Sequence, residues 1–303
     1  MGAIKTEYPN VEVHVHLETQ LRAGEKEPGV LPQVKNIIAV ASGKGGVGKS
    51  TVSTNLALGL LKAGHKVGLI DADLYGPSIP TMFGLEGQRP KVRDVHGKPI
   101  LIPLEVQGLH VMSIGFIVEP EQAVVLRGPR LAGIMKQFIQ DCLWPELDYL
   151  IIDLPPGTGD IQLTLVQTVP LTGAILVTTP QKVALVDAIK AMNMFRLPSV
   201  NVPILGVIEN MSWFSPPELP EKKYFLFGQG GGKLLATEAE CPLLGQVPIV
   251  EAIRVAGDEG IPSVSGKDAK LQSIWTQIGK KVMDSVEYRN KMYAPSRIVD
   301  IKS

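Results

Sequence analysis

Short runs of apolar residues alternate along the chain with longer segments in which apolar residues recur every three or four positions. The runs predict buried strands at residues 36–41, 66–71, 109–114, 149–153, 173–178, 204–208 and 243–247. Helical patterns lie between most of them, at 49–63, 129–141, 160–169, 184–195 and 230–239. This alternation predicts an α/β fold with a doubly wound, mainly parallel sheet that carries helices on both faces.

Two helices have clear boundaries or faces in the sequence. The first should end at Ala63, because Gly64 follows as a C-terminal cap. A last amphipathic helix is expected over 269–286, with apolar residues at helical spacing. We interpret its apolar face as core packing, since the tail 287–303 has no continuous apolar face for a bilayer.

Residues 1–33 differ from the rest of the chain. Residues 11–18 alternate as a strand and place His14 and His16 on one face, where a half-exposed strand is favoured over a metal pair that lacks a third ligand. We therefore predict an N-terminal strand and linker at 1–33, a main domain at 34–288 and a tail at 289–303. The N-terminal strand and linker look like the remnant of a small preceding domain.

The composition is typical of a large α/β domain. The chain has 303 residues, of which 45% are hydrophobic and 5% aromatic. Thirty basic and 30 acidic residues cancel, which argues against nucleic-acid or membrane binding through bulk charge. There is no signal peptide or membrane-spanning run, and the two cysteines, Cys142 and Cys241, favour a reducing compartment, so we expect a cytoplasmic protein.

A phosphate-binding loop follows the first predicted strand. Its pattern, Gly-x4-Gly-Lys-Ser/Thr, is met by Gly43, Gly48, Lys49 and Ser50. Glycines let backbone N–H groups converge on an anion, the lysine binds the β- and γ-phosphates, and the serine hydroxyl binds Mg²⁺. We expect a nucleotide to contact Gly43, Lys44, Gly45, Gly46, Val47, Gly48, Lys49, Ser50 and Thr51.

The loop also has a second lysine, Lys44, which the general pattern does not require. Two cations this close on a compact loop repel each other unless an anion lies between them. This favours a functional role for Lys44 over that of a solvated surface lysine.

Acidic residues end two further predicted strands, where ligands of open α/β sheets bind. Asp71 and Asp73 are two residues apart and are expected to share Mg²⁺ and an attacking water, although a turn-forming role remains open for one of them. Asp153 is expected to hold Mg²⁺ through water, and the N–H of Gly157 to meet a γ-phosphate.

These motifs together resemble the Mrp (ApbC-type) branch of the deviant Walker A P-loop ATPases, the iron-sulfur cluster carrier family related to MinD, ParA and nitrogenase iron protein. The likeness runs from about Val34 to about Gly260. It rests on Lys44 with Lys49, on the segments Asp71–Pro80 and Asp153–Asp160, and on Glu209-Asn-Met-Ser212, Phe227-Gly-Gln-Gly-Gly-Gly232 and Leu244-Gly-Gln-Val-Pro248.

The resemblance implies a Mg²⁺-dependent ATPase that acts as a homodimer and serves iron-sulfur client apoproteins. Lys44, Lys49 and Asp73 would be catalytic, with Lys44 reaching the partner's ATP and Asp73 orienting the water. Ser50, Asp73 and Asp153 would form the Mg²⁺ site. Asn210 would hydrogen-bond the adenine, although an Asn at the end of a strand is, taken alone, more typical of a turn.

One segment departs from the family. Its members usually carry Cys-x-x-Cys at 213–227, so that two subunits hold a [4Fe-4S] cluster, but Pro216 and Leu219 stand there in this chain. Cys142 is expected to be core, and Cys241 a poor candidate for a ligand. The cluster is therefore possible by family, but its ligands are not evident.

Three functions follow from these observations. The first is an ATP-hydrolysing cluster carrier whose ligands are altered, supplied by a partner or lost. The second is a nucleotide-switched positioning or scaffold ATPase of the MinD/ParA kind, and the third is a metal-free regulatory ATPase. No nucleic-acid or membrane partner is expected.

Overall fold

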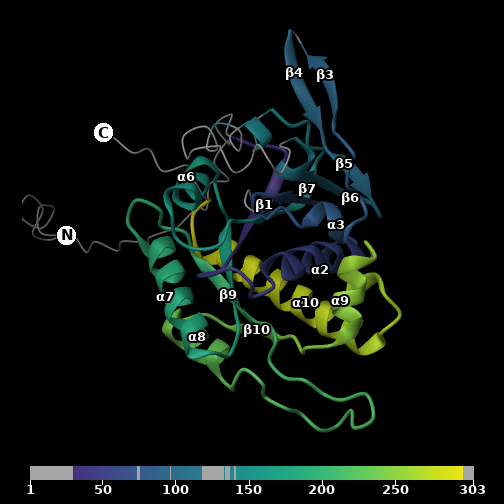
Figure 1. Ribbon diagram of the computed structural model, residues 1–303. Helices are drawn as coiled ribbons and strands as arrows, with labels where there is room; N and C mark the ends of the chain where they lie inside the picture. Colours follow the sequence, from purple (N-terminus) through teal and green to yellow (C-terminus); the bar gives the residue numbers. More distant parts are fainter. Residues whose placement is uncertain are drawn as a thin grey trace, which may run out of the picture.

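A single mixed sheet forms the centre of the computed structural model, which describes residues 30–73, 76–95, 97–117, 133, 137–139 and 141–295, with 160–161 described in backbone only. The sheet has 8 strands in the order β10-β9-β8-β1-β7-β2-β6-β5 (Figure 1). All neighbours are parallel except β5 and β6. The strands are β1 Val34–Ala41, β2 Val67–Asp71, β5 Leu104–Val106, β6 Leu109–Ser113, β7 Leu147–Asp153, β8 Gly173–Thr178, β9 Ile204–Glu209 and β10 Leu243–Gln246.

Helices cover both faces of this sheet (Figure 1). Because the right-handed connections β1–α2–β2 and β7–α6–β8 cross the sheet in opposite directions, they place α2 and α6 on opposite faces. Helix α10 packs on α2, and α7 packs on α8 on the other side. The helices are α2 Lys49–Lys62, α3 Ile79–Met82, α6 Asp160–Thr168, α7 Lys182–Arg196, α8 Gly231–Glu238, α9 Glu251–Asp258 and α10 Ala269–Met292, with 3-10 turns at Ile114–Phe116 and Ser263–Ser265.

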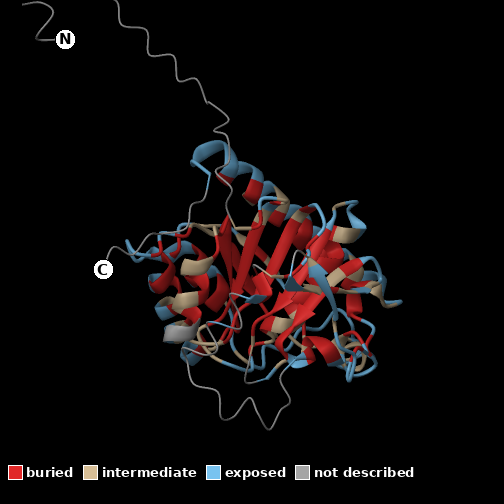
Figure 2. Ribbon diagram, turned by 90° about the horizontal axis from the view of Figure 1, so that it is seen from above, coloured by how far each residue is buried: buried red, intermediate tan, exposed pale blue. Residues whose placement is uncertain are grey.

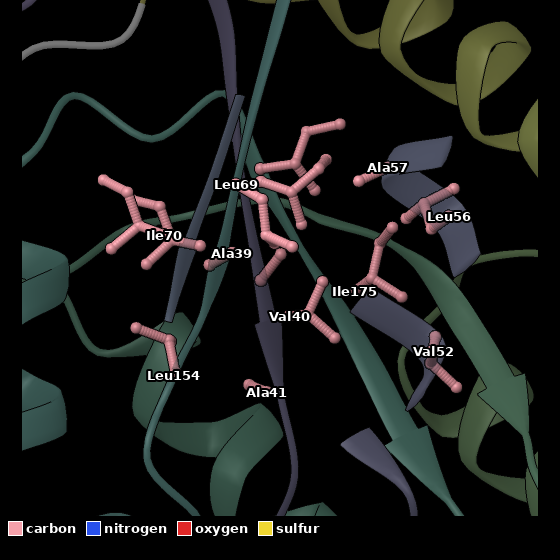
Figure 3. Close-up of a cluster of buried hydrophobic side chains, with 14 of the residues drawn as sticks. Ala39, Val40, Ala41, Val52, Leu56, Ala57, Leu69, Ile70, Leu154 and Ile175 are labelled. Atoms are coloured by element: carbon pink, nitrogen blue, oxygen red, sulfur yellow. The ribbon is translucent and has the colours of Figure 1, made fainter. Parts of the chain in front are cut away.

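The core lies between these layers, and the central strands are buried on both faces (Figure 2). Every residue of β2 and of β8 is buried, which explains why they are continuous apolar runs in the sequence. In Figure 3, Val52 and Leu56 of α2 lie beside side chains of β1 and β8. Each fully buried side chain of this size contributes about 1.5–3 kcal/mol, so the packing of α2 fixes the start of that helix against the sheet.

The predicted fold class and strands are confirmed. Helix α2 ends as expected, because Gly64 takes a left-handed φ of 92° and the Gly64 and His65 N–H groups bond the last carbonyls. The last helix is longer than predicted and ends at Met292. Most of the predicted helix 129–141, and the N-terminal strand with His14 and His16, lie outside the described residues.

Strands β3 Lys91–Val95, β4 Lys98–Ile102 and β5, and helices α3 and α9, were not predicted from the sequence. Strands β3 and β4 form a separate antiparallel hairpin, and β5 adds an antiparallel edge to the main sheet. Helix α9 is amphipathic but has only 8 residues, and none of them is fully buried. Cys142 is buried as expected, but it pairs with Leu101 in an isolated bridge rather than ending a helix. None of the described helices meets the length and hydropathy needed to span a bilayer.

Candidate nucleotide-binding site

The predicted phosphate-binding loop connects the carboxyl end of β1 to the first turn of α2. Two of its glycines take left-handed conformations, Gly46 with φ 77° and Gly48 with φ 79°. Gly48 is the N-cap of α2, so the positive end of that helix faces the space that the loop encloses. The loop therefore has the backbone shape that an anion-binding turn requires.

Gly43 serves a different purpose from the one predicted. Its φ is not in the left-handed region, and a Cβ atom there would lie 2.0 Å from the carbonyl carbon of Asp187 in α7. The absence of a side chain thus lets the backbone of α7 approach the loop directly. Turning the chain is the role of Gly46 and Gly48 only.

A buried cluster of charges lies directly behind the loop. The Nζ of Lys49 is 2.8 Å from Oδ2 of Asp153 and 3.4 Å from Oδ2 of Asp73. The hydroxyl of Ser50 donates to the same Asp153 oxygen at 2.6 Å. Burial lowers the pKa of Lys49, but the Asp153 and Asp73 carboxylates outweigh it, so the pKa is raised and the ammonium stays charged. The structure therefore brings together the lysine, the serine and two of the predicted acids.

Ser53 belongs to this cluster but was missed in the sequence. Its hydroxyl donates to Oδ1 of Asp153 at 2.6 Å. Its position, one helical turn after Lys49 and Ser50, was the available signal, because residues three and four apart share a helix face. The two serine hydroxyls and Lys49 together hold both oxygens of the fully buried Asp153.

Asp71 has the structural role that was left open for one of the two strand-end acids. It is fully buried and pairs in register with Asp153 on β7. Its carboxylate accepts hydrogen bonds from the hydroxyl of Ser113 and from the N–H groups of Asp73 and Ile79. Burial, with the nearby Asp153 charge, raises its pKa to about 7. Asp71 thus fixes the turn that presents Asp73 to Lys49, and the sharing of Mg²⁺ by the two acids stays a prediction.

Gly157 lies next to the phosphate-binding loop, but its N–H is already engaged. It donates to the carbonyl of Ser42 at 2.9 Å, and Gly157 has a left-handed φ of 94°. Contact between this N–H and a γ-phosphate, as predicted, would require the bond to Ser42 to break.

Asn210 lies under the loop. Its side-chain amide donates to the carbonyl of Val47 at 2.9 Å, and it packs so closely on Gly48 that a Cβ there would lie 2.1 Å from Nδ2. The backbone N–H of Asn210 bonds Thr178 at the end of β8. In this structure Asn210 braces the loop, and its contact with adenine stays a prediction.

Lys44 borders the open side of the site. A cavity of about 230 Å³ is lined by residues of the loop and of the two acidic segments, including Lys44, Lys49, Ser50, Thr51, Asp73, Ser78 and Pro156. Within the described parts of the chain, no carboxylate forms an ion pair with Lys44. The cavity therefore presents one lysine bound to acids at its base and another at its rim.

The residues that replace Cys-x-x-Cys lie in a folded loop between β9 and α8 (Figure 1). Phe214 and Tyr224 exchange two backbone hydrogen bonds of 2.8 Å, and the ammonium of Lys223 lies 4.0 Å from the centre of the Trp213 ring. Pro216 and Leu219, within this loop, offer no metal ligand. Among the residues that the structure describes, no three His, Cys, Asp or Glu side chains are grouped to hold a metal ion.

The two cysteines are both free thiols. Burial raises the pKa of Cys142 to about 12 and that of Cys241 to about 11, so with no metal bound both are protonated at neutral pH.

A parallel sheet with a glycine loop, a lysine and a strand-end aspartate at its carboxyl edge defines a P-loop NTPase. The model of the NUBPL iron-transfer P-loop NTPases, of the ParA group, matches residues 33–283. The chain belongs to this family.

Relatives agree with this assignment. An iron-sulfur cluster carrier protein of Synechocystis sp. is 48% identical over 277 residues, covering 91% of this chain and 78% of the relative. An iron-sulfur cluster carrier protein of Escherichia coli is 46% identical over 279 residues, covering 91% of this chain and 73% of that relative.

Solved structures agree as well. A nucleotide-binding protein of Archaeoglobus fulgidus in complex with ADP has a TM-score of 0.69 at 38% identity, covering 81% of this chain and 92% of that one. The cell division ATPase MinD of Pyrococcus furiosus shares the fold, with a TM-score of 0.60 at 24% identity. The match covers 82% of this chain and 99% of MinD.

Proposed function

We propose that this protein is a Mg²⁺-dependent ATPase that works as a homodimer in the transfer or assembly of iron-sulfur clusters. The observation that carries the proposal is the cluster formed by Lys49, Ser50, Asp73 and Asp153 behind the predicted phosphate-binding loop. ATP is the substrate, and the cluster is the cargo.

The polar groups around the cavity suit both the phosphates of a nucleotide and Mg²⁺. Phosphate oxygens suit the loop N–H groups, the α2 N-terminus and Lys49. A hydroxyl and two carboxylates suit Mg²⁺, which prefers oxygen ligands. Ser50, Asp73 and Asp153 would hold the ion, which when bound would neutralise charge on the phosphate oxygens.

The ammonium of Lys49 can bind either the two carboxylates or the phosphate oxygens of a nucleotide. In the structure its ammonium is held by Asp153 and Asp73. Phosphate oxygens in the cavity would draw it toward the loop and release the acids for the cation and for a water. Asp73, the more exposed of the two acids, would then accept a hydrogen bond from that water and orient it.

The homodimer is supported by the surface around the loop. Exposed apolar side chains lie on α7, which touches the loop at Gly43, and on α8, which touches Pro180 just before α7. Val183, Val186 and Leu234 are 68%, 55% and 62% exposed. A second copy on this face would bury them and bring its own Lys44 to the cavity rim.

The iron-sulfur role is supported by the relatives that are named cluster carriers. Because Pro216 and Leu219 replace the usual thiols, we propose that the chain does not hold a cluster at this loop by a cysteine pair. Partner thiols, or other ligands, would complete any site that it uses.

The ATPase is tested by two lysine variants and one control. Lys49→Ala should abolish tight ATP binding in calorimetry, because it removes the cation at the base of the cavity. Lys44→Ala should retain binding but slow hydrolysis by about 10²- to 10³-fold, typical of the loss of one positioned donor. Lys62→Ala, at the far end of α2, should change neither. Equal loss of binding in both loop variants would contradict the cross-dimer role of Lys44.

The cargo is tested separately by anaerobic reconstitution with iron and sulfide, alone and with an apoprotein acceptor. We expect little cluster on the chain alone and more when the acceptor is present. A stable cluster on the isolated chain that is lost in Cys241→Ser or Cys142→Ser would contradict the proposal that these cysteines are not ligands. A colourless mixture under all conditions would refute the transfer role while leaving the ATPase intact.

A further inference from the structure

The β3–β4 hairpin projects from the body, beyond the edge of the main sheet (Figure 1). A lone two-stranded hairpin is marginally stable in water. This one is fixed at its base, where the N–H of Leu101 donates to Asp141 and the N–H of Leu143 donates to Leu101. The body thus holds an exposed two-stranded ribbon in place.

The two faces of the ribbon differ in charge. The strand register places Lys91 opposite Ile102, Arg93 opposite Ile100, and Val95 opposite Lys98. Because alternate side chains share a face, these three cations and three aliphatic residues lie on one side. The single acid of the two strands, Asp94, belongs to the other side and accepts from the N–H of Gly97 in the turn.

These cations have no acidic partner within the described residues, and Lys91, Arg93 and Lys98 are all exposed. Cations on an edge strand also prevent aggregation. In a chain whose 30 basic and 30 acidic residues cancel, three cations without acids on one face of a ribbon form a local excess of positive charge.

The outer edge of β3 is open as well. Its backbone pairs with β4 on one side, and alternate residues of a strand direct N–H and C=O groups to the other side. No backbone bond within the described residues uses that outer side of β3. The edge therefore offers hydrogen-bonding groups to an added strand.

We propose that the β3–β4 hairpin is a docking site for an extended acidic segment of a partner protein, which adds to the β3 edge. Lys91 and Arg93 are two residues apart, roughly 7 Å along the strand. Acidic side chains at every second position of an extended segment repeat at the same distance. The residues between these acids direct their side chains to the opposite face, where Val92 is 62% exposed and fits β-branched side chains of such a segment. The inference goes beyond the ATPase and does not depend on it.

Other polyanions fit this surface less well. Single-stranded nucleic acid is bound by aromatic side chains that stack on bases, and no aromatic residue is described in either strand. Anionic bilayers bind surfaces that insert apolar side chains, but the apolar residues on the charged face are partly covered. A short protein segment matches the size and the alternation of this face.

The test uses the full chain and a fluorescein-labelled decapeptide of alternating Glu and Thr, followed by anisotropy. Lys91→Glu, Arg93→Glu and Lys98→Glu combined should weaken binding at least tenfold, the equivalent of about 1.4 kcal/mol. The matched control reverses Lys267, Lys270 and Lys280, which are exposed near or on α10, and should bind as the parent does. Thermal unfolding and ATP hydrolysis should be unchanged in both variants.

Four further probes decide the mode of binding: two altered peptides, single-stranded DNA and phosphatidylglycerol vesicles. A peptide with Gln for Glu should bind at least tenfold more weakly, and so should a Glu–Thr peptide N-methylated at alternate residues, which cannot add to a strand. Equal binding by both triple variants, or no binding to the parent chain at millimolar peptide, would overturn the proposal. Tighter binding of single-stranded DNA or of phosphatidylglycerol vesicles through the same three cations would also overturn it.

Discussion

Replacement of Gly43 by alanine tests the contact between the phosphate-binding loop and α7. The added Cβ would lie 2.0 Å from the carbonyl carbon and 2.1 Å from the oxygen of Asp187, and 2.4 Å from the nitrogen of Ala188. All three are backbone atoms inside a helix, so no side-chain rotation relieves the overlap. Either α7 or the loop must move.

The size of the effect follows from these distances. Carbon atoms pack at about 3.5–4.0 Å, so a shift of more than about 1 Å is needed. Overpacking of a well-filled region typically costs about 1–3 kcal/mol, and we expect the upper end of this range here. Because the shift displaces the loop that holds Lys49, nucleotide affinity should fall at the same time.

Two neighbouring glycines serve as controls. An alanine at Gly45 would meet only Pro156 at 4.0 Å, so Gly45→Ala should change stability by less than about 0.5 kcal/mol. Gly46→Ala has free space but a φ of 77°, and should cost about 1–2 kcal/mol through the backbone alone.

Urea unfolding gives the stability of each variant, and calorimetry with ATP gives its affinity. The expected order of stability is parent, Gly45→Ala, Gly46→Ala, Gly43→Ala. If Gly43→Ala unfolds at the same urea concentration as Gly45→Ala and binds ATP equally well, the close approach of α7 to the loop is wrong.

Three further predictions concern buried polar groups. The folded-state pKa of Asp71, about 7, lies above its ordinary 3.8, so this residue makes the fold less stable as pH rises from about 4 to 7. Asp71→Asn should reduce this loss of stability, which amounts to about 1.4 kcal/mol per unit of pKa shift. Urea unfolding at several pH values measures it, and an unchanged dependence of the unfolding free energy on pH would contradict the prediction. Gln162 is buried and its amide has no hydrogen-bond partner among the described residues, so Gln162→Leu should be neutral or stabilising by about 1–3 kcal/mol, and a loss of melting temperature would refute this. Asn210→Ala should weaken ATP and GTP binding equally if the role of the amide is to hold the Val47 carbonyl. A loss of affinity for ATP alone would show instead that the amide contacts the adenine.

The order of strands and helices was predictable because the central strands are buried on both faces and therefore form continuous apolar runs. The hairpin was missed because β3 is exposed on almost every residue, although the turn at Gly97, with φ 79°, was a usable signal. Helix α9 was missed because its 8 residues are too few for a clear helical period, although its apolar residues gather on one face.

The site was predictable where a residue acts through its local sequence, as Lys49 and Ser50 do. It was not predictable where a role depends on contacts across the fold. Gly43 meets α7 more than 140 positions later, and the bond from Asn210 to Val47 spans 163 positions. The pattern of Asp71 and Asp73 was recognised, but only the tertiary structure shows that one of them is enclosed while the other reaches Lys49.

We predict that the hydrogen bond from the N–H of Gly157 to the carbonyl of Ser42 distinguishes a triphosphate from a diphosphate. A γ-phosphate bound by this N–H, as expected from the sequence, would have to replace the Ser42 carbonyl as its acceptor. A diphosphate has no γ-phosphate and would leave the bond in place. The two strands β1 and β7, adjacent in the sheet, would then report the chemical state of the nucleotide through one amide, whose rate of hydrogen exchange differs between the two ligands.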